Sequence, residues 1–275
     1  MKPQFIQING LNLAYYTQND DRRKILFFVH GNSLSACTWR KQFDDSIFDS
    51  YRLIAIDLPG HGQSDSSVTP NEDYTLPGLA RLAAEALGQL VGEYPCILAG
   101  MSMGANLVAE MLPYGITPQG IVLAGPSVVG EGCPVSAVVQ PGTHVYTVFT
   151  EEAPREEVVI YGQESSLRAD SRDLELFVEG YFRVDPAFRR VLSRSLDAHQ
   201  YGDEIRMLRN SGIPQCVIMG AEERVVYPNY LDNVSLPLWR DTVHLLPGAS
   251  HLVQVDQPAA FNELVKAFAS EVFSE

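Results

Sequence analysis

Apolar residues in this chain fall into short continuous runs that alternate with segments of helical spacing. The runs at 25–29, 96–99, 121–125 and 216–220 have strand length and predict strands buried on both faces of a sheet. Residues 51–58 and 242–246 predict two further strands. Between these strands, apolar positions recur at helical spacing at 39–48, 76–91, from about 104, and at 258–273. The alternation predicts an α/β fold with a mostly parallel central sheet, right-handed crossovers and flanking helices.

Two other segments depart from this alternation. Residues 5–8 and 11–16 flank Asn9-Gly10, a two-residue hairpin signal, and predict an antiparallel pair at the start of the fold. From 126 to 212, helices are expected near 154–161, 171–182 and 186–198, with no strand pattern. We therefore expect a core of residues 1–125 and 213–275, with residues 126–212 inserted after the sixth strand as a helical cap, or lid.

Composition is that of an ordinary globular domain. Of 275 residues, 45% are hydrophobic and 20% charged, and no apolar stretch reaches the roughly 20 residues needed to span a bilayer. The first residues run directly into a predicted strand with no apolar signal core, so we expect a cytoplasmic protein.

The charge balance limits the possible partners. A formal net charge of -14 and a pI near 4.8 oppose binding to nucleic acid or to an anionic membrane surface, and favour a small neutral substrate. The four cysteines are far apart and form neither a disulfide framework nor a metal-ligand spacing. We expect no metal and no cofactor, and the sequence leaves the oligomeric state open.

The pentapeptide Gly100-Met101-Ser102-Met103-Gly104 lies between a predicted strand and a predicted helix. In a G-x-S-x-G elbow the serine oxygen stands above the sheet, and the next backbone NH and the helix N-terminus face any oxyanion formed there. The pentapeptide alone also occurs by chance, so its chemistry depends on what else the chain supplies.

Polar residues follow three other predicted strands. They are His30-Gly31-Asn32, Glu222-Glu223, and His251 in Gly248-Ala249-Ser250-His251. Ligands of open α/β sheets bind beyond the carboxyl ends of the strands, where all of these should meet. A serine hydroxyl needs a base to remove its proton, and the base needs a carboxylate to orient it, so the order Ser, acid, His indicates nucleophilic catalysis.

Five motifs together resemble the α/β-hydrolase family over nearly the whole chain. They are Val29-His30-Gly31-Asn32, Asp57-Leu58-Pro59-Gly60-His61-Gly62, the elbow, the Gly220-x-x-Glu223 turn and the Gly248-x-x-His251 turn. The resemblance implies that Ser102 is the nucleophile and His251 the base, and that the backbone NH groups of Asn32 and Met103 form the oxyanion hole. It implies that the acid is Glu223, which replaces the family's usual aspartate, with Glu222 as the alternative.

A narrower resemblance rests on His30-Gly31-Asn32-Ser33, the Ser, Glu and His set, and the segments 158–161 and 184–190. In these the chain is similar to the metal-independent serine lactonases that open the ring of N-acyl homoserine lactones. The resemblance implies that Tyr161 hydrogen-bonds the lactone and that the Asn32 side chain assists. Trp39 and His30 are further candidates for the substrate pocket, against the alternatives of a packed core aromatic and a loop-structuring histidine.

The sequence therefore predicts a serine hydrolase that opens a lactone or cleaves a carboxylic ester, with N-acyl homoserine lactone ring opening (quorum quenching) as the leading hypothesis. A general carboxylesterase and a carbon-carbon bond hydrolase are the alternatives among enzymes. A non-catalytic small-molecule receptor on the same fold is the alternative of another class. Whether Ser102 forms an acyl-enzyme or positions water directly stays open.

Overall fold

An eight-stranded, mostly parallel sheet runs through the computed structural model, which describes residues 1–130, 132–166 and 171–274. The strands are β1 (Gln4–Ile8), β2 (Leu11–Gln18), β3 (Ile25–Val29), β4 (Arg52–Ile56), β5 (Cys96–Met101), β6 (Gly120–Ala124), β7 (Gln215–Gly220) and β8 (Leu238–Leu246). They lie in the order β1-β2-β4-β3-β5-β6-β7-β8. Only β2 pairs antiparallel, with β1 and with β4, so the predicted fold class is confirmed for the described chain.

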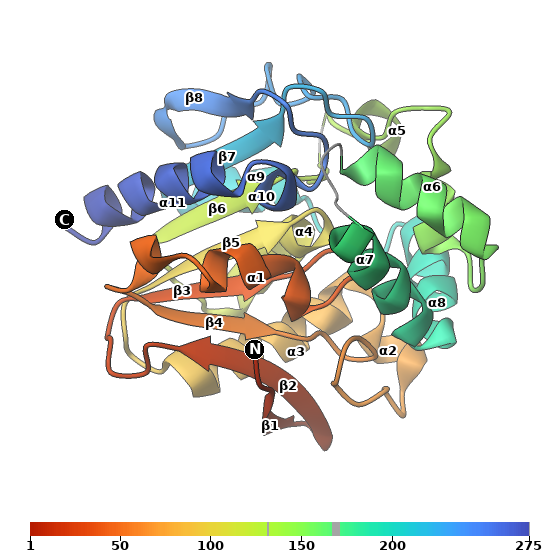
Figure 1. Ribbon diagram of the computed structural model, residues 1–275, viewed down its shortest axis with the longest axis horizontal. Helices are drawn as coiled ribbons and strands as arrows, with labels where there is room; N and C mark the ends of the chain where they lie inside the picture. The colour runs from red at the N-terminus through yellow and green to blue at the C-terminus, as the bar shows by residue number, and fades with distance from the viewer. Residues whose placement is uncertain (131, 167–170, 275) are drawn as a thin grey trace.

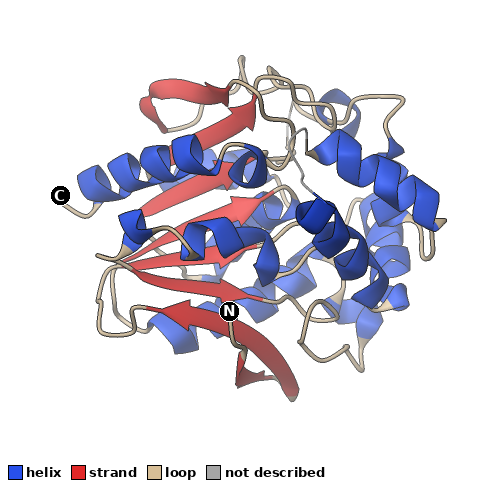
Figure 2. Cartoon of the chain, in the orientation of Figure 1, coloured by secondary structure: helices blue, strands red, loops and turns tan. Residues whose placement is uncertain are grey.

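Helices cover both faces of this sheet (Figures 1 and 2). The longer ones are α3 (Leu76–Val91), α4 (Met103–Met111), α6 (Arg155–Ser165), α7 (Ser171–Arg183), α8 (Pro186–Asp197), α9 (Glu204–Ser211) and α11 (Pro258–Val272). Shorter helices are α1 (Arg40–Phe43), α2 (Pro70–Asp73), α5 (Val135–Val138) and α10 (Val253–Asp256), with 3-10 turns η1 (Ala36–Trp39), η2 (Ser46–Phe48), η3 (Leu112–Tyr114) and η4 (His144–Phe149). In Figure 1, α1, α10 and α11 lie in front of the sheet, and α3 and α4 lie behind it.

The opening hairpin forms as the Asn9-Gly10 signal predicts. Ile8 pairs with Leu11, so the turn has two residues, and both adopt positive φ, 49° at Asn9 and 85° at Gly10. Type I′ turns require positive φ at both positions, which asparagine and glycine tolerate best.

The central strands bring the candidate residues to one edge of the sheet. Every residue of β3, β5, β6 and β7 is buried, because helices cover both faces. The parallel strands β3, β5, β7 and β8 end directly before the segments that hold Asn32, Ser102, Glu223 and His251. These residues are far apart in sequence, and the parallel topology gathers them.

Some predicted elements differ in detail. The single helix expected at 39–48 is wrong: the chain forms η1, α1 and η2, because the Asp45 carboxylate accepts from the NH of Ile47 and starts a new turn. The last strand begins at Leu238 rather than at 242. It does so through a bulge against β7, where Arg240 and Asp241 both have positive φ.

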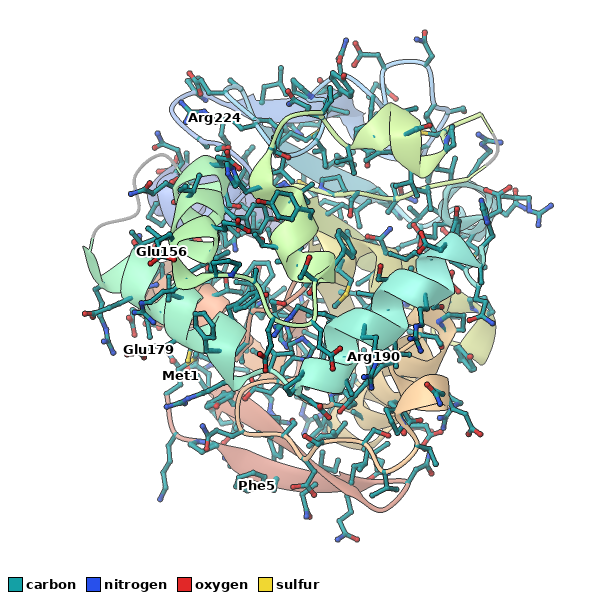
Figure 3. All side chains as sticks on the ribbon, turned by 90° about the vertical axis from the view of Figure 1, so that its right-hand side faces the viewer. Met1, Phe5, Glu156, Glu179, Arg190 and Arg224 are labelled. Carbon is teal, nitrogen blue, oxygen red and sulfur yellow. The ribbon has the colours of Figure 1, made fainter. Side chains whose placement is uncertain are left out.

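The segment 126–212 places α6, α7 and α8 together at the end of the sheet where the parallel strands finish (Figure 1). Figure 3 looks onto that end, and the exposed Glu156, Glu179 and Arg190 mark the outer faces of these three helices. The helix α9, which the sequence pattern missed, packs instead against α4 beside the sheet. The interpretation of this segment as a cap stays a prediction.

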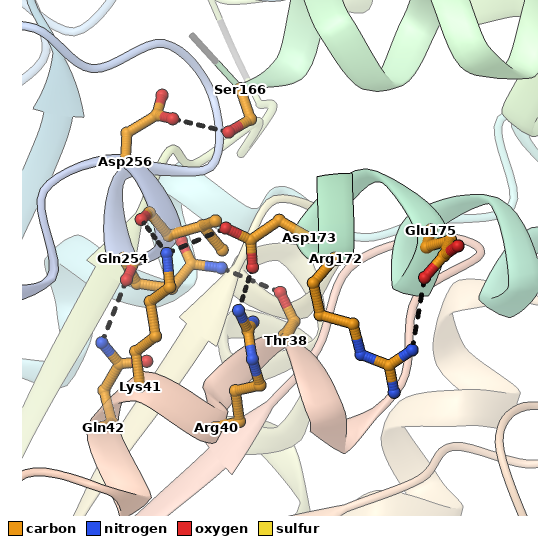
Figure 4. A network of polar contacts seen from close by, with 11 residues as sticks. Thr38, Arg40, Lys41, Gln42, Ser166, Arg172, Asp173, Glu175, Gln254 and Asp256 are labelled. Atoms are coloured by element: carbon orange, nitrogen blue, oxygen red, sulfur yellow. Dashed lines mark hydrogen bonds and ion pairs between the residues drawn. The ribbon is translucent and has the colours of Figure 1, made fainter. Parts of the chain in front are cut away.

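Polar contacts fasten this segment to the rest of the chain (Figure 4). The buried carboxylate of Asp173, on α7, pairs with Arg40 and, at 2.9 Å, with Lys41 of α1. Lys41 Nζ also donates to the Val255 carbonyl at 2.8 Å. The ion pairs of Asp173 with Arg40 and Lys41 are mostly removed from water, and they hold α7 in one position over α1.

Candidate active site

Ser102 stands alone between β5 and α4 in a strained conformation. Its φ of 51° and ψ of -122° lie in a region that side chains rarely adopt. Two hydrogen bonds hold it there: its NH donates to the Ala124 carbonyl at 3.0 Å, and its carbonyl accepts from the Ala105 NH at 2.7 Å. The strain is therefore imposed by the neighbouring strand and by the first turn of the helix.

The two glycines of the elbow are required by close backbone approach. A Cβ at Gly100 would lie 2.3 Å from the Gly104 carbonyl oxygen, and a Cβ at Gly104 would lie 2.4 Å from the Val29 carbonyl oxygen. Real Cβ atoms do not come this close to backbone atoms. Strand, turn and helix can thus pass one another only with glycine at both positions.

Three side chains from three strand ends form one hydrogen-bonded chain. Ser102 Oγ lies 2.8 Å from His251 Nε2, and His251 Nδ1 lies 2.9 Å from Glu223 Oε2. The side chains of His251 and Glu223 are 2% and 0% exposed. Because a carboxylate only accepts, Nδ1 carries the imidazole proton, and Nε2 is left to accept from the serine hydroxyl. This tautomer is the one a general base needs.

The two adjacent glutamates have different surroundings. Glu223 Oε1 accepts from the NH groups of Val225 and Val226 at 2.8 and 3.3 Å, which fixes its carboxylate toward His251. Glu222 is exposed, and its Oε2 accepts from the Gly248 NH at 2.7 Å, so it braces the loop before His251. Of these two glutamates, it is Glu223 whose carboxylate is hydrogen-bonded to the His251 imidazole.

The backbone NH groups of Asn32 and Met103, near Ser102, are free to donate hydrogen bonds to an oxyanion. In the described part of the chain, neither the NH of Asn32 nor that of Met103 hydrogen-bonds to a protein acceptor. Met103 is the first residue of α4, where helical NH groups lack an internal partner. The Gly31 turn packs against the elbow, since a Cβ there would lie 3.2 Å from Ser102 Cβ. The Asn32 side chain is held in place, with Nδ2 donating to the Val148 carbonyl at 2.8 Å.

A pocket opens above Ser102 and His251. It contains about 850 Å³ of space not filled by protein atoms, counting the solvent at its mouth. Its polar lining consists of Asn32, Ser102, Asn106, Ser127, Tyr161, Ser165 and His251. Its apolar lining includes Val129, Val138, Val148, Phe149, Phe177, Leu192, Leu196 and Leu252. Size and lining suit a small, largely apolar molecule.

Tyr161 reaches this pocket from α6. Its ring meets Phe177 edge to face, with centroids 5.8 Å apart, and 6% of the residue is exposed. Burial raises the pKa of its phenol, and the nearby Glu223 carboxylate adds to this effect. The hydroxyl is therefore neutral and able to donate a hydrogen bond into the pocket.

Trp39 and His30 lie outside the pocket wall, and both expectations are corrected. Trp39 is fully buried, with its ring against Phe28 at 4.9 Å between centroids. His30 Nδ1 donates to the Gly31 carbonyl at 2.8 Å and its Nε2 accepts from the Leu58 NH at 3.0 Å. Burial lowers the pKa of this imidazole. Both side chains are buried inside the fold and do not line the pocket.

The sequence reasoning gave no role to two further groups, Asn106 in the pocket lining and Arg189 outside it. Asn106 lies in the first turn of α4, directly after the elbow, and it lines the pocket as Ser102 does; a polar residue at that place is a signal that could have found it. Arg189 of α8 is 2% exposed and donates to the carbonyls of Thr150, Glu151 and Tyr181. Arg189 lies in segment 184–190, which carries the narrower resemblance, but nothing local indicates its role, because the packing of α8 alone brings its partners to it.

The described residues contain neither a cluster of metal-binding side chains nor a membrane-spanning helix. No group of three or more His, Cys, Asp or Glu side chains is arranged to hold a metal ion in that part of the chain. No helix in the same residues is long and apolar enough to cross a membrane.

Comparisons with known proteins extend these observations. A model of the alpha/beta hydrolase family matches residues 26–264. The uncharacterized hydrolase YugF of Bacillus subtilis is 26% identical over 268 residues, covering 95% of each chain. The N-acyl homoserine lactonase AidH, solved with N-butanoyl homoserine, has a TM-score of 0.90 at 22% identity, covering 99% of this chain and 97% of that chain. An esterase of Exiguobacterium antarcticum has a TM-score of 0.79 at 15% identity, covering 98% of this chain and 100% of that chain.

Proposed function

The chain belongs to the alpha/beta hydrolase family, and we propose that it hydrolyses lactones or carboxylic esters, with N-acyl homoserine lactones as the leading substrate class. The observation that carries the proposal is the buried chain from Ser102 through His251 to Glu223 at the base of an otherwise apolar pocket. Acyl transfer is the chemistry for which such a chain is built.

In the first half of the reaction, Ser102 Oγ attacks the carbonyl carbon while its proton passes to His251 Nε2. Glu223, hydrogen-bonded to Nδ1 at 2.9 Å, stabilises the imidazolium that results. The carbonyl electron pair moves onto oxygen, and the NH groups of Asn32 and Met103 donate to this oxyanion. Each donor is expected to contribute about 3 kcal/mol to the stability of the transition state.

In the second half, the tetrahedral intermediate collapses and the bond to the leaving oxygen breaks. His251 gives its proton to that oxygen, which in a lactone stays attached to the acyl group. Water, deprotonated by His251, then attacks the acyl-enzyme and releases the acid and Ser102. In the alternative route Ser102 only positions the water, and no covalent intermediate forms. Mass spectrometry of a substrate-treated sample distinguishes the routes, because only the first gives an acylated Ser102.

The pocket lining supports a neutral, partly apolar substrate. Segment 126–212, proposed as the cap, supplies most of the apolar wall, which suits an acyl chain. We assign Tyr161, together with the Asn32 side chain, to hydrogen-bond the lactone. The solved AidH structure with N-butanoyl homoserine supports testing this substrate class first.

The test compares hydrolysis of short-chain and long-chain N-acyl homoserine lactones with aryl esters and thioesters, in the presence of a chelator. We expect chelator-resistant lactone turnover that Ser102→Ala lowers by about 10⁴-fold or more. Loss of activity on chelation would contradict a metal-free mechanism. Ester turnover without lactone turnover would assign the protein as a carboxylesterase, and tight lactone binding without turnover would assign it as a receptor.

A further inference from the structure

Asn106 and Ser127 form a polar pair in the pocket lining, apart from Ser102 and His251. Asn106 belongs to α4, and Ser127 lies in the loop after β6. Both residues line the pocket, and Ser127 is partly exposed while Asn106 is 6% exposed. The reaction proposed above uses neither side chain.

The hydrogen bonds of this pair fix which atom donates and which accepts. Asn106 Nδ2 donates to the Ser127 carbonyl at 2.9 Å, and a carbonyl only accepts, so the amide cannot be turned around. Asn106 Oδ1 therefore faces Ser127 Oγ, 2.7 Å away. Because Oδ1 cannot donate, the Ser127 hydroxyl must give its proton to it.

Glu204 of α9 locks the amide further. Glu204 is fully buried, and its Oε2 accepts from Asn106 Nδ2 at 2.6 Å and from the Val129 NH at 2.9 Å. Both protons of Asn106 Nδ2 thus have partners, as has the proton of Ser127. Asn106 and Ser127 therefore have no proton left to donate to a ligand in the pocket. They can only accept a hydrogen bond, chiefly through the lone pairs of Ser127 Oγ.

We propose that Ser127 Oγ, oriented by Asn106, is a specificity site that accepts a hydrogen bond from an N–H or O–H group of the substrate. The inference rests on the proposed function and narrows its substrate class. The preferred ester or lactone carries an amide N–H or a hydroxyl near the scissile carbonyl. A substrate with only ether or carbonyl oxygens at that place would bring an acceptor oxygen against the acceptor lone pairs of Ser127 Oγ. Neither oxygen would then have a donor, and unpaired polar groups in an apolar pocket are costly.

Matched substrate pairs test this preference directly. One pair is N-hexanoyl homoserine lactone and its analogue with the amide N–H replaced by oxygen. The other is 4-nitrophenyl N-acetylglycinate and 4-nitrophenyl acetoxyacetate, which differ in the same way. We expect the wild type to favour the N–H member of at least one pair by about tenfold in kcat/KM, the effect of one hydrogen bond.

Ser127→Ala should bring that ratio close to one by slowing the N–H substrate alone. The matched control is Ser195→Ala, a buried serine of α8 outside the pocket lining, which should keep the wild-type ratio. A wild-type ratio near one for both pairs, or a ratio that Ser127→Ala leaves unchanged, would overturn the inference.

A binding measurement tests the role of Ser127 independently of whether the protein hydrolyses the compounds. Calorimetry with Ser102→Ala and with Ser102→Ala/Ser127→Ala compares the affinities for the two members of each pair without turnover. If the wild type hydrolyses none of the four compounds, the proposed function fails, and the binding ratio still decides the role of Ser127. We expect the N–H ligand to lose about tenfold in affinity in the double variant, whereas equal affinities in both variants would refute the acceptor site.

Discussion

The two walls of the pocket are built in different ways. On the wall formed by the strand ends, each polar side chain is held by a specific hydrogen bond, as Glu223 is held by two backbone NH groups. On the wall formed by segment 126–212, most of the lining is apolar, and the side chains of Val138, Val148 and Leu192 make packing contacts rather than hydrogen bonds. The first wall determines the reaction at the substrate carbonyl, and the second determines which substrate shapes fit the pocket.

This difference leads to different sensitivities. A hydrogen bond in the first wall determines a tautomer or a donor direction, so an isosteric substitution should change the rate and spare the fold. A change in the second wall alters how helices pack, so it should change stability and substrate affinity before it changes the chemical step.

The largest effect is expected at Glu223. Glu223→Gln keeps the size of the side chain but replaces the carboxylate that holds the proton of His251 on Nδ1, 2.9 Å away. With an amide there the imidazole can turn to the wrong tautomer, so kcat should fall by about 10⁴-fold with little change in thermal stability. Steady-state kinetics on any substrate that the wild type turns over measures this.

Glu222→Gln is the matched control for Glu223→Gln. Glu222 is exposed and bonds the Gly248 NH, 2.7 Å away, an interaction that the glutamine oxygen can keep. Its activity should stay within about threefold of the wild type, as for an exposed hydrogen bond. Equal losses in the two variants, or a larger loss at Glu222, would show that Glu223 is not the acid of the triad.

The same contrast explains what could be predicted from the sequence. The strands and the grouping of Ser102, Glu223 and His251 follow from local signals, because glycines and apolar runs are read within a few residues and parallel topology gathers the strand ends. The apolar wall carries no such signal. Tyr161 was found only through a resemblance. Trp39 and His30 were wrongly placed in the pocket because their burial depends on distant segments, such as Phe261 of α11 against Trp39 and the loop at His61 against His30.

A smaller effect is expected at Arg189, which belongs to α8, the helix that carries the lining residue Leu192. Its guanidinium is buried, donates to three backbone carbonyls and lies 3.9 Å from the centre of the Tyr181 ring. Arg189→Met keeps much of the side-chain volume and leaves these carbonyls without their donor. The free energy of unfolding in urea should fall by about 3 kcal/mol, since hydrogen bonds to a charged group are lost inside the protein.

Its neighbour Arg190 supplies the control. Arg190 is 44% exposed and pairs with Glu151 at 3.1 Å, so Arg190→Met should cost less than about 1 kcal/mol. For Arg189→Met we also expect KM to rise more than kcat falls, because the wall shifts while the serine, imidazole and carboxylate stay in place. A fall in kcat at unchanged KM would contradict the division between the two walls.

The smallest effect on activity is expected at Glu204, whose carboxyl is hydrogen-bonded to Asn106 on one wall and to Val129 on the other. Burial raises the pKa of its carboxyl well above the ordinary 4.5, and the nearby Glu110 carboxylate adds to the shift. The folded state therefore holds a proton that the unfolded chain releases near pH 4.5, so the stability contributed by this group is complete below that pH. It is lost as the pH rises from there through the folded pKa.

Glu204→Gln removes this titration while keeping an oxygen for the Val129 and Asn106 donors. Urea unfolding between pH 4.5 and 8 should show the wild type losing stability relative to the variant, by at most about 1.4 kcal/mol per pH unit within the window. Glu263 is exposed, so the free energy of unfolding of Glu263→Gln should change with pH in the same way as that of the wild type. If the unfolding free energy of Glu204→Gln also changes with pH as that of the wild type does, Glu204 is ionised in the folded protein. Because the glutamine oxygen still orients Asn106, the preference for N–H substrates should survive, which separates the charge of Glu204 from its positioning role.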